Sequence, residues 1–188
     1  MRNEKLIEFF RELIKLKKTQ RSGWIVSGVK NVESVADHSF MTTLMVLILG
    51  KEKDIDLGKS LKMAIIHDIA ECRIGDVITW ENFHMTKDVK KEIEEEAMKN
   101  LLSILGEQGK EYFDIWKEYE ERKTKEARFV KAIDNLEMVL QALEYENEEK
   151  PLNKYIKTFF EGNDIKFIID TDEDLSKLVK FIISLRKK

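Results

Sequence analysis

The sequence of 188 residues contains a single cysteine, Cys72, and a single proline, Pro151. With one thiol the chain cannot form an intramolecular disulfide, and it cannot supply the several cysteines of a zinc finger. Only eight glycines are present. The chain therefore has few of the residues that interrupt regular secondary structure.

Long apolar runs are also absent. The longest, residues 44–49, is far shorter than the ~20 residues that a helix needs to span a bilayer. The N-terminus, MRNEKLIEFF, has charges among its apolar positions and lacks the pattern of a secretory signal. We expect a cytoplasmic protein without a membrane partner.

Charge of one sign is not in excess either. The chain has 33 Lys and Arg against 36 Asp and Glu, which gives a formal net charge of -3. Proteins that bind nucleic acid usually carry a basic excess, so the balance gives no reason to expect a nucleic-acid polymer as partner. A local basic pocket is still compatible with this composition.

Apolar residues recur at helical spacing along most of the chain. They make up 43% of it, enough for the core of one domain over residues 1–188. Ser34 and Asp37 have the spacing of a capping box, which predicts a helix that starts there and ends near Gly50. The periodicity predicts further helices over residues 6–16, 57–72, 87–105, 111–121 and 124–145. We expect a compact, all-α, multi-helix bundle.

The pattern is weaker over residues 147–170, where we expect little regular structure. A brief helix is predicted after Pro151. The stretch KFIID has the composition of a short strand, but a lone strand would have no partner. Thr171 is then expected to cap a last helix that ends at Leu185.

One segment, AIIHDIAE at residues 64–71, puts a histidine and an aspartate in the middle of an apolar helix. Burying an unpaired carboxylate costs free energy unless a cation or a donor compensates it. On a helix, Glu71 would lie one turn after His67 on the same face, with Asp68 about 100° away. The three side chains would then form a polar strip on an otherwise apolar helix.

Two other predicted helices carry a polar residue among apolar positions. His38 interrupts an apolar stripe, and Asp134 lies at the margin of the apolar face in FVKAIDNLEMVL. If the three helices pack together, these two residues and the pair His67–Asp68 could surround one divalent cation, which would compensate Asp68. The residues alone leave other interpretations open, because His38 could be a hydrogen-bonded core histidine and Asp134 a solvated carboxylate.

The arrangement of these four residues resembles that of the HD-domain metal-dependent phosphohydrolases. Three blocks narrow the resemblance to the 5′-deoxynucleotidase branch: RSGW at 21–24, NVESVADHS at 31–39 and HDIAECRIGD at 67–76. Asp37 and Val32 stand where the family more often has Glu and Pro, but neither is a candidate ligand. The similarity runs to at least Leu143. It implies an all-α homodimer that removes phosphate from (deoxy)ribonucleoside 5′-monophosphates with a divalent metal.

The resemblance also implies a role for each residue that matches the family's motifs. Glu71, in H-D-x-x-E, and Asp76, in G-D, would be the catalytic carboxylates. Arg21 would bind the phosphate of the substrate, and Trp24 would sit near its sugar or base. The metal ligands would be His38, His67, Asp68 and Asp134.

Two nitrogen and two oxygen ligands would leave two positions on a six-coordinate ion. One position can take a phosphate oxygen and the other a water molecule, which the metal activates for attack. This donor set favours Mn²⁺, Co²⁺ or Fe²⁺ over Zn²⁺ or Mg²⁺, because four protein ligands would close a tetrahedral zinc site.

Two alternative functions stay open. Another HD phosphohydrolase could act on cyclic nucleotides, nucleoside triphosphates or guanosine polyphosphates, although the short chain has no additional metal-binding histidines. A non-catalytic helical protein could bind nucleotides and keep the metal as a structural ion, but the presence of Glu71 and Asp76 counts against it. Three residues are left out of the site: His84 has no partner motif, Cys72 lacks a nearby base, and Arg73 could either add positive potential or face solvent.

Overall fold

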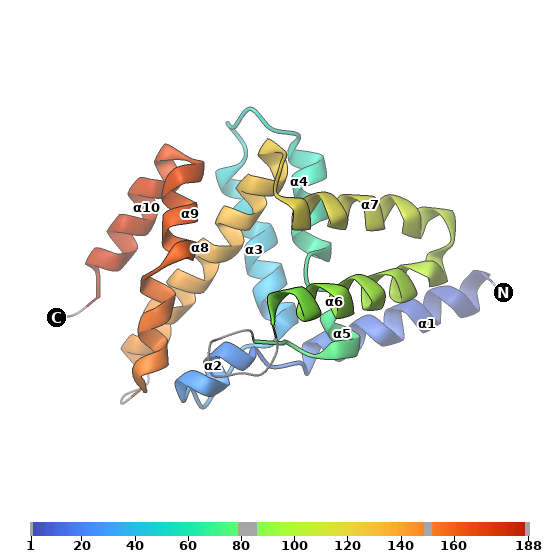
Figure 1. Cartoon of the computed structure of the whole chain (residues 1–188), viewed down its shortest axis with the longest axis horizontal. Coiled ribbons are helices and arrows are strands. Elements are labelled where there is room, and N and C mark those ends of the chain that lie inside the picture. Colours follow the sequence, from blue (N-terminus) through green and yellow to red (C-terminus); the bar gives the residue numbers. More distant parts are fainter. Residues whose placement is uncertain (1, 79–85, 149–151, 187–188) are drawn as a thin grey trace.

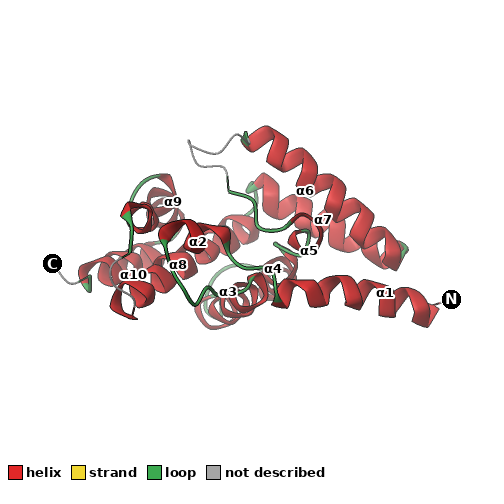
Figure 2. Cartoon of the chain, turned by 90° about the horizontal axis from the view of Figure 1, so that it is seen from below, coloured by secondary structure: helices red, strands yellow, loops and turns green. Residues whose placement is uncertain are grey.

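The computed structural model describes residues 2–78, 86–148 and 152–186, and it confirms an all-α fold. Figure 2 shows helices joined by loops, and these three ranges contain no strand. The α-helices are α1 Arg2–Ile14, α2 Ser22–Ser27, α3 Val35–Leu49, α4 Leu57–Ile66, α5 Glu71–Ile74, α6 Lys87–Leu102, α7 Glu107–Glu121, α8 Lys125–Glu148, α9 Asn163–Thr171 and α10 Glu173–Ser184. The 3₁₀-helices are η1 Lys15–Lys17, η2 Ser103–Leu105 and η3 Lys154–Phe160. Among the described helices, none is both long and apolar enough to cross a membrane.

Helix α8 is the centre of the fold. It contacts α3, α4, α7, α9 and α10, and Figure 1 shows α9 and α10 on one side of it and α4 and α7 on the other. Its side chains Ile133 and Leu136 are fully buried, but the same helix also buries the polar residues Asp134, Asn135 and Glu137. Buried polar groups need hydrogen-bond partners, so these positions mark a polar region inside the core.

Helix α3 begins as its capping box predicts. The hydroxyl of Ser34 accepts a hydrogen bond from the backbone N–H of Asp37, and the Asp37 carboxylate accepts one from the N–H of Ser34. The inner face of α3 carries the fully buried His38, whereas Phe40 and Ile48 are 66% and 63% exposed. A helix with apolar residues all round usually has neighbours on every side, so the outer face of α3 is a candidate contact surface.

The structure divides the helix predicted over residues 57–72 into α4 and α5. His67 donates a hydrogen bond from Nδ1 to the carbonyl oxygen of Ala64, at 2.7 Å. In a continuing α-helix this carbonyl would accept the N–H of Asp68 instead. The N–H of Glu71 then bonds to the carbonyl three residues back rather than four. The prediction of one continuous helix is therefore wrong, because the histidine side chain ends it.

The C-terminal region is more regular than its sequence pattern predicts. The stretch KFIID lies in α9, where Ile165 and Ile168 are buried at helical spacing and the helix packs on α8. The strand prediction is therefore wrong. Thr171 is the last residue of α9 rather than the cap of the final helix. That cap is Asp172, whose carboxylate accepts hydrogen bonds from two backbone N–H groups of α10.

Candidate metal centre

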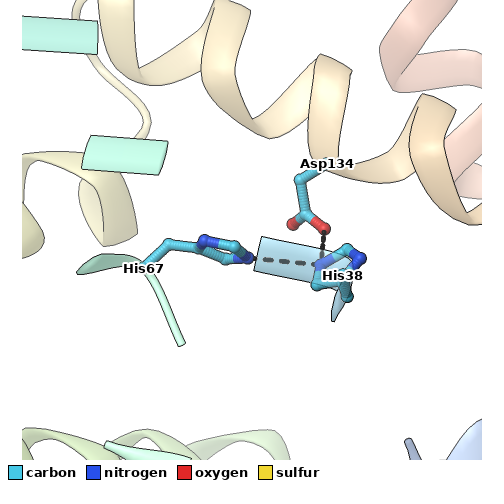
Figure 3. A group of neighbouring side chains, drawn as sticks. All are labelled: His38, His67 and Asp134. Carbon is cyan, nitrogen blue, oxygen red and sulfur yellow. Dashed lines mark hydrogen bonds and ion pairs between the residues drawn. The ribbon is translucent and has the colours of Figure 1, made fainter. Parts of the chain in front are cut away.

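Two histidines and an aspartate meet in the core between α3, α4 and α8. His38 lies on α3, His67 directly follows α4, and Asp134 lies on α8. Figure 3 shows the three side chains directed at one another. The Nε2 atoms of the two histidines are 3.3 Å apart, and His38 Nε2 is 3.1 Å from Asp134 Oδ1. All three residues are buried, and their donor atoms lie within 4.8 Å of one another.

Asp68 is outside this group of three, but its carboxylate lies beside both histidines. Its Oδ2 is 3.1 Å from His67 Nε2 and 3.7 Å from His38 Nε2. Since the chain turns after α4, two adjacent side chains can reach one point, which a straight helix would hinder. The structure thus brings together the four side chains that the sequence pattern selects as candidate ligands.

Hydrogen bonds on the far side of each imidazole determine its tautomer. Nδ1 of His67 faces the carbonyl oxygen of Ala64, which can only accept, so this nitrogen carries the proton. Nδ1 of His38 is 2.6 Å from Oε2 of Glu137, a carboxylate that accepts in the same way. In the neutral rings both Nε2 atoms then present lone pairs to each other. Two facing lone pairs require a cation between them, either a proton or a metal ion.

His38 can carry such a proton at neutral pH, because its pKa is raised. Burial and the nearby Arg21 guanidinium oppose a positive charge on the ring. Hydrogen bonds to Asp134 and Glu137 outweigh both effects and raise the pKa of His38 to about 9. In the absence of a metal ion, a proton therefore compensates the centre at neutral pH.

The two carboxylates of the centre stay ionised. Burial opposes ionisation of Asp134, but the charge of Lys131 and the bond to His38 hold its pKa well below its ordinary value of 3.8. Although desolvation opposes this, the pKa of the half-buried Asp68 is likewise lowered, chiefly by His67. Two imidazole nitrogens and two ionised oxygens form a donor set that fits a divalent transition-metal ion.

Glu71 and Asp76 border the centre in different ways. Glu71 begins α5 and is 4% exposed, and within the described part of the chain its Oε2 has no hydrogen-bond partner. Burial and the charges of Asp68 and Asp76 raise the pKa of Glu71 well above 4.5. Asp76 Oδ2 instead accepts from the N–H of Ser22 at 2.6 Å, and its backbone carbonyl accepts from the Ser22 hydroxyl at 2.7 Å. Asp76 thus anchors the start of α2, whereas Glu71 retains a carboxyl oxygen for another partner.

Arg21 lies immediately before α2 and faces the centre. Its Nη1 is 3.2 Å from Asp68 Oδ2, and its side chain is 12% exposed. Burial opposes the charge on the guanidinium, but the carboxylates of Asp76 and Asp68 raise its pKa, so it stays charged. A guanidinium fixed beside the candidate ligands is suited to bind phosphate oxygens.

Trp24 is packed into the core on the inner side of α2. It is 1% exposed, and its indole N–H donates to Glu33 Oε1 at 2.7 Å. Its ring stacks on Phe159 with a centroid distance of 4.0 Å and meets the ring of Tyr145 edge-on. In this conformation Trp24 offers no exposed face to a base. Its contacts hold α2, and with it Arg21, against η3 and α8.

A model of the HD domain matches residues 13–171 of the chain. The chain belongs to the HD-domain family. The 5′-deoxynucleotidase HDDC2 of Dictyostelium discoideum is 41% identical over 171 residues, which cover 86% of this HD-domain protein and 89% of that one. The 5′-deoxynucleotidase HDDC2 of Homo sapiens is 39% identical over 148 residues, which cover 78% of this chain and 71% of the human protein. A conserved hypothetical protein from Pyrococcus furiosus has a similar structure, with a TM-score of 0.79 and 32% sequence identity. The match covers 95% of this chain and 99% of that one.

Several partners of the centre in this HD domain were missed by the sequence analysis. Tyr119 and Lys131 each donate a hydrogen bond of 2.7 Å to Asp134 Oδ2. Glu137, which holds His38, lies three residues after Asp134 and so shares its face of α8. This spacing of two acidic residues on one helix face could have identified Glu137 from the sequence. The contact of Tyr119 has no local signal, because it depends on the packing of α7 against α8.

Glu33 lies behind the centre. Together with His38 and Glu137 it forms a second group whose donor atoms lie within 4.8 Å of one another. Burial and the charge of Glu137 raise the pKa of Glu33 to about 7. The carboxylate of Glu33 thus accepts the indole N–H of Trp24 and lies near the Glu137 carboxylate that bonds to His38.

Of the three residues left out of the site, the structure describes Cys72 and Arg73. His84 lies outside the described residues. The thiol of Cys72 is buried, which raises its pKa to about 11, and Arg73 donates to Glu12 at the surface. A thiol with a raised pKa is a poor nucleophile at neutral pH, in agreement with leaving Cys72 out of the site.

Proposed function

We propose that this HD-domain protein is a metal-dependent phosphomonoesterase that releases phosphate from (deoxy)ribonucleoside 5′-monophosphates. The observation that carries the proposal is the convergence of the four candidate ligands on one point beside Arg21. The relatives named 5′-deoxynucleotidases, 41% and 39% identical over most of this chain, support the choice of substrate class.

The cation that we propose is Mn²⁺, Co²⁺ or Fe²⁺ rather than Zn²⁺ or Mg²⁺. Two imidazoles count against Mg²⁺, which prefers oxygen ligands, and four protein ligands would leave a tetrahedral Zn²⁺ with no open position. When bound, the cation polarises the phosphate and activates a water molecule. The residues that would hold it are His38, His67, Asp68 and Asp134.

Arg21 and Glu71 supply the groups that act on the substrate. Arg21 would bind the phosphate oxygens through its fork of N–H donors, next to Asp68. When water adds to phosphorus and the bond to the 5′ oxygen breaks, the water loses a proton and the departing oxygen gains one. Glu71 Oε2, without a partner among the described residues, would exchange these protons.

Asp76 and Trp24 complete the proposed site. Asp76 would be the second catalytic carboxylate, and its two bonds to Ser22 also fix the start of α2 and so the position of Arg21. Trp24 would support substrate binding indirectly, because its contacts in the core hold α2 and thereby Arg21 in place. A direct contact between its ring and a sugar or base requires α2 to move from the described position.

We further propose that the protein is a homodimer, with the outer face of α3 as its contact surface. Phe40, Met41, Leu47 and Ile48 on this face are 40–66% exposed, and the apolar residues Ile7, Phe10 and Ile14 of α1 are also exposed. Exposed apolar side chains in such number are typical of a protein interface. A second copy of the chain would cover them.

The compartment that we propose is the cytoplasm, where thiols stay reduced. The single cysteine, Cys72, is a free thiol in the core. Fractionation of cells that express the tagged chain tests the assignment, and recovery from the medium or from membranes would contradict it.

The experiment that tests the function is phosphate release from a panel of nucleotides by the metal-loaded protein. The panel includes deoxy- and ribonucleoside 5′-monophosphates, a cyclic nucleotide, a nucleoside triphosphate and a guanosine polyphosphate. We expect Mn²⁺- or Co²⁺-dependent release from the 5′-monophosphates. If the protein cleaves only one of the other nucleotides in the panel, it is a different phosphohydrolase. If it binds metal and cleaves none of them, the proposed function is wrong.

The variant Glu71→Gln separates an enzyme from a nucleotide-binding protein. We expect it to retain metal and to lose most of its turnover, since the amide cannot exchange protons. Glu144→Gln, on the exposed side of α8, is the matched control. Equal turnover in Glu71→Gln and wild type would remove Glu71 from the mechanism.

A further inference from the structure

The two carboxylate oxygens of Asp134 have different surroundings. Oδ1 is 3.1 Å from His38 Nε2 and faces the candidate metal centre. Oδ2 accepts two hydrogen bonds of 2.7 Å, one from the hydroxyl of Tyr119 and one from the ammonium group of Lys131. A carboxylate can bind a cation through one oxygen or through both. In Asp134 one oxygen is already engaged.

Both donors are fixed by the fold. Tyr119 lies on α7 and is 3% exposed, with its ring edge-on to that of His67 at a centroid distance of 5.5 Å. Lys131 lies one turn before Asp134 on α8, with its side chain 18% exposed and its ammonium group 6.0 Å from the Tyr119 ring centroid. Since α7 packs directly against α8, the bond between Tyr119 and Asp134 is part of the helix packing.

We propose that Tyr119 and Lys131 are positioning residues that leave Asp134 Oδ1 for a cation and withhold Oδ2 from it. The inference rests on the metal-dependent function proposed above. If both oxygens of Asp134 were bound, it would take one of the two positions that four single-atom ligands leave on a six-coordinate ion. The two donors therefore preserve a position for substrate or water. Lys131 also offsets the charge of the buried carboxylate.

Two substitutions remove one donor each. Tyr119→Phe deletes the hydroxyl and keeps the ring, and Lys131→Met deletes the charge and keeps the length of the side chain. Lys131→Arg restores a cation at this position. The matched controls are Tyr112→Phe on α7 and Lys125→Met on α8, whose polar atoms contact surface groups.

The first measurement is a titration of the metal-free protein with Co²⁺, followed by visible absorption, which requires no turnover. We expect Tyr119→Phe and Lys131→Met to bind Co²⁺ more tightly, by about 10-fold, because the freed Oδ2 becomes a further ligand and, in Lys131→Met, a positive charge beside the cation is lost. Their absorption spectra should differ from that of the wild type, because the coordination by Asp134 changes. Lys131→Arg should return the affinity to near the wild-type value, and both controls should match the wild type.

The second measurement is phosphate release at saturating Co²⁺. We expect kcat of Tyr119→Phe and Lys131→Met to fall while KM changes little, because the substrate's own contacts remain. If affinity, spectrum and kcat match the wild type and only the melting temperature falls, both residues are merely structural and the inference is wrong. If the wild type binds Co²⁺ but cleaves no nucleotide, the proposed function fails, and the titration alone then decides the positioning role.

Discussion

The Nε2 atoms of His38 and His67 lie 3.3 Å apart, although the two residues are 29 positions apart in the chain. Each ring uses its Nδ1 for a bond on the opposite side, to Glu137 and to the carbonyl of Ala64. Both imidazoles are thereby held in the tautomer that presents a lone pair to the centre. Such an arrangement is stable only with a cation, which is the physical basis of the proposed function.

Glu137→Gln removes the carboxylate that orients His38 and keeps its size. We expect the dissociation constant for Co²⁺ to rise about 10–100-fold, because a neutral amide holds the imidazole less firmly and makes it a weaker ligand. Competition with a chromophoric chelator measures the constant. Glu144→Gln on the same helix is the control, and an unchanged constant in Glu137→Gln would contradict this role of the carboxylate.

Arg21→Lys retains a positive charge beside Asp68 and loses the planar fork of donors. We expect kcat/KM for deoxyadenosine 5′-monophosphate to fall about 10–100-fold, the cost of losing a charge-assisted hydrogen bond to phosphate. Steady-state kinetics at saturating metal measures the change. Arg73→Lys, at the surface pair with Glu12, should behave as the wild type. A variant of Arg21 with wild-type kcat/KM would rule out the phosphate contact.

The stability of the metal-free protein should fall as the pH rises from 6.5 to 9. The folded-state pKa of His38, about 9, exceeds its ordinary value of 6.5. The stabilisation that comes with its proton is therefore complete below pH 6.5 and is lost as the pH passes 9. Glu33, raised from 4.5 to about 7, changes stability in the same direction at lower pH. Asp68 and Asp134, whose pKa values are lowered, are ionised throughout this range.

Thermal melts of the metal-free protein at several pH values measure this effect. Added Mn²⁺ or Co²⁺ should raise the melting temperature more at pH 9 than at pH 6.5, because metal and proton compete for the same nitrogens. A melting temperature that rises between these two pH values without metal would contradict the assignment.

Phe40→Glu should separate the proposed homodimer. A carboxylate at a position that is 66% exposed costs little in the monomer but is unfavourable inside an apolar contact. Light scattering should give twice the 22.2 kDa chain mass for the wild type and a single chain for the variant. Phe181→Glu, on α10 and 60% exposed, is the control and should stay dimeric. A monomeric wild type would contradict the proposed homodimer.

The parts of the fold that could be predicted from the sequence depend on local interactions. The cap formed by Ser34 and Asp37 needs only residues three apart, and it starts α3 as expected. The four candidate ligands could be selected because each interrupts an apolar helical face. Their convergence is non-local, yet the helices must bury those faces and so bring the polar residues together.

The parts that could not be predicted depend on a single side-chain bond or on helix packing. The break between α4 and α5 follows from the bond of His67 to the carbonyl of Ala64, for which the segment AIIHDIAE has no signal. The stretch KFIID is helical because α8 offers an apolar surface to α9. Tyr119 contacts Asp134 only because α7 packs on α8.

The central claim is that one cation is held by side chains from α3, α8 and the turn after α4. An anomalous difference map from crystals grown with Mn²⁺ or Co²⁺ tests it most directly. We predict one strong peak about 2.0–2.3 Å from the Nε2 atoms of His38 and His67 and from carboxylate oxygens of Asp68 and Asp134. A peak bound elsewhere, or none at these four residues at saturating metal, would contradict the account.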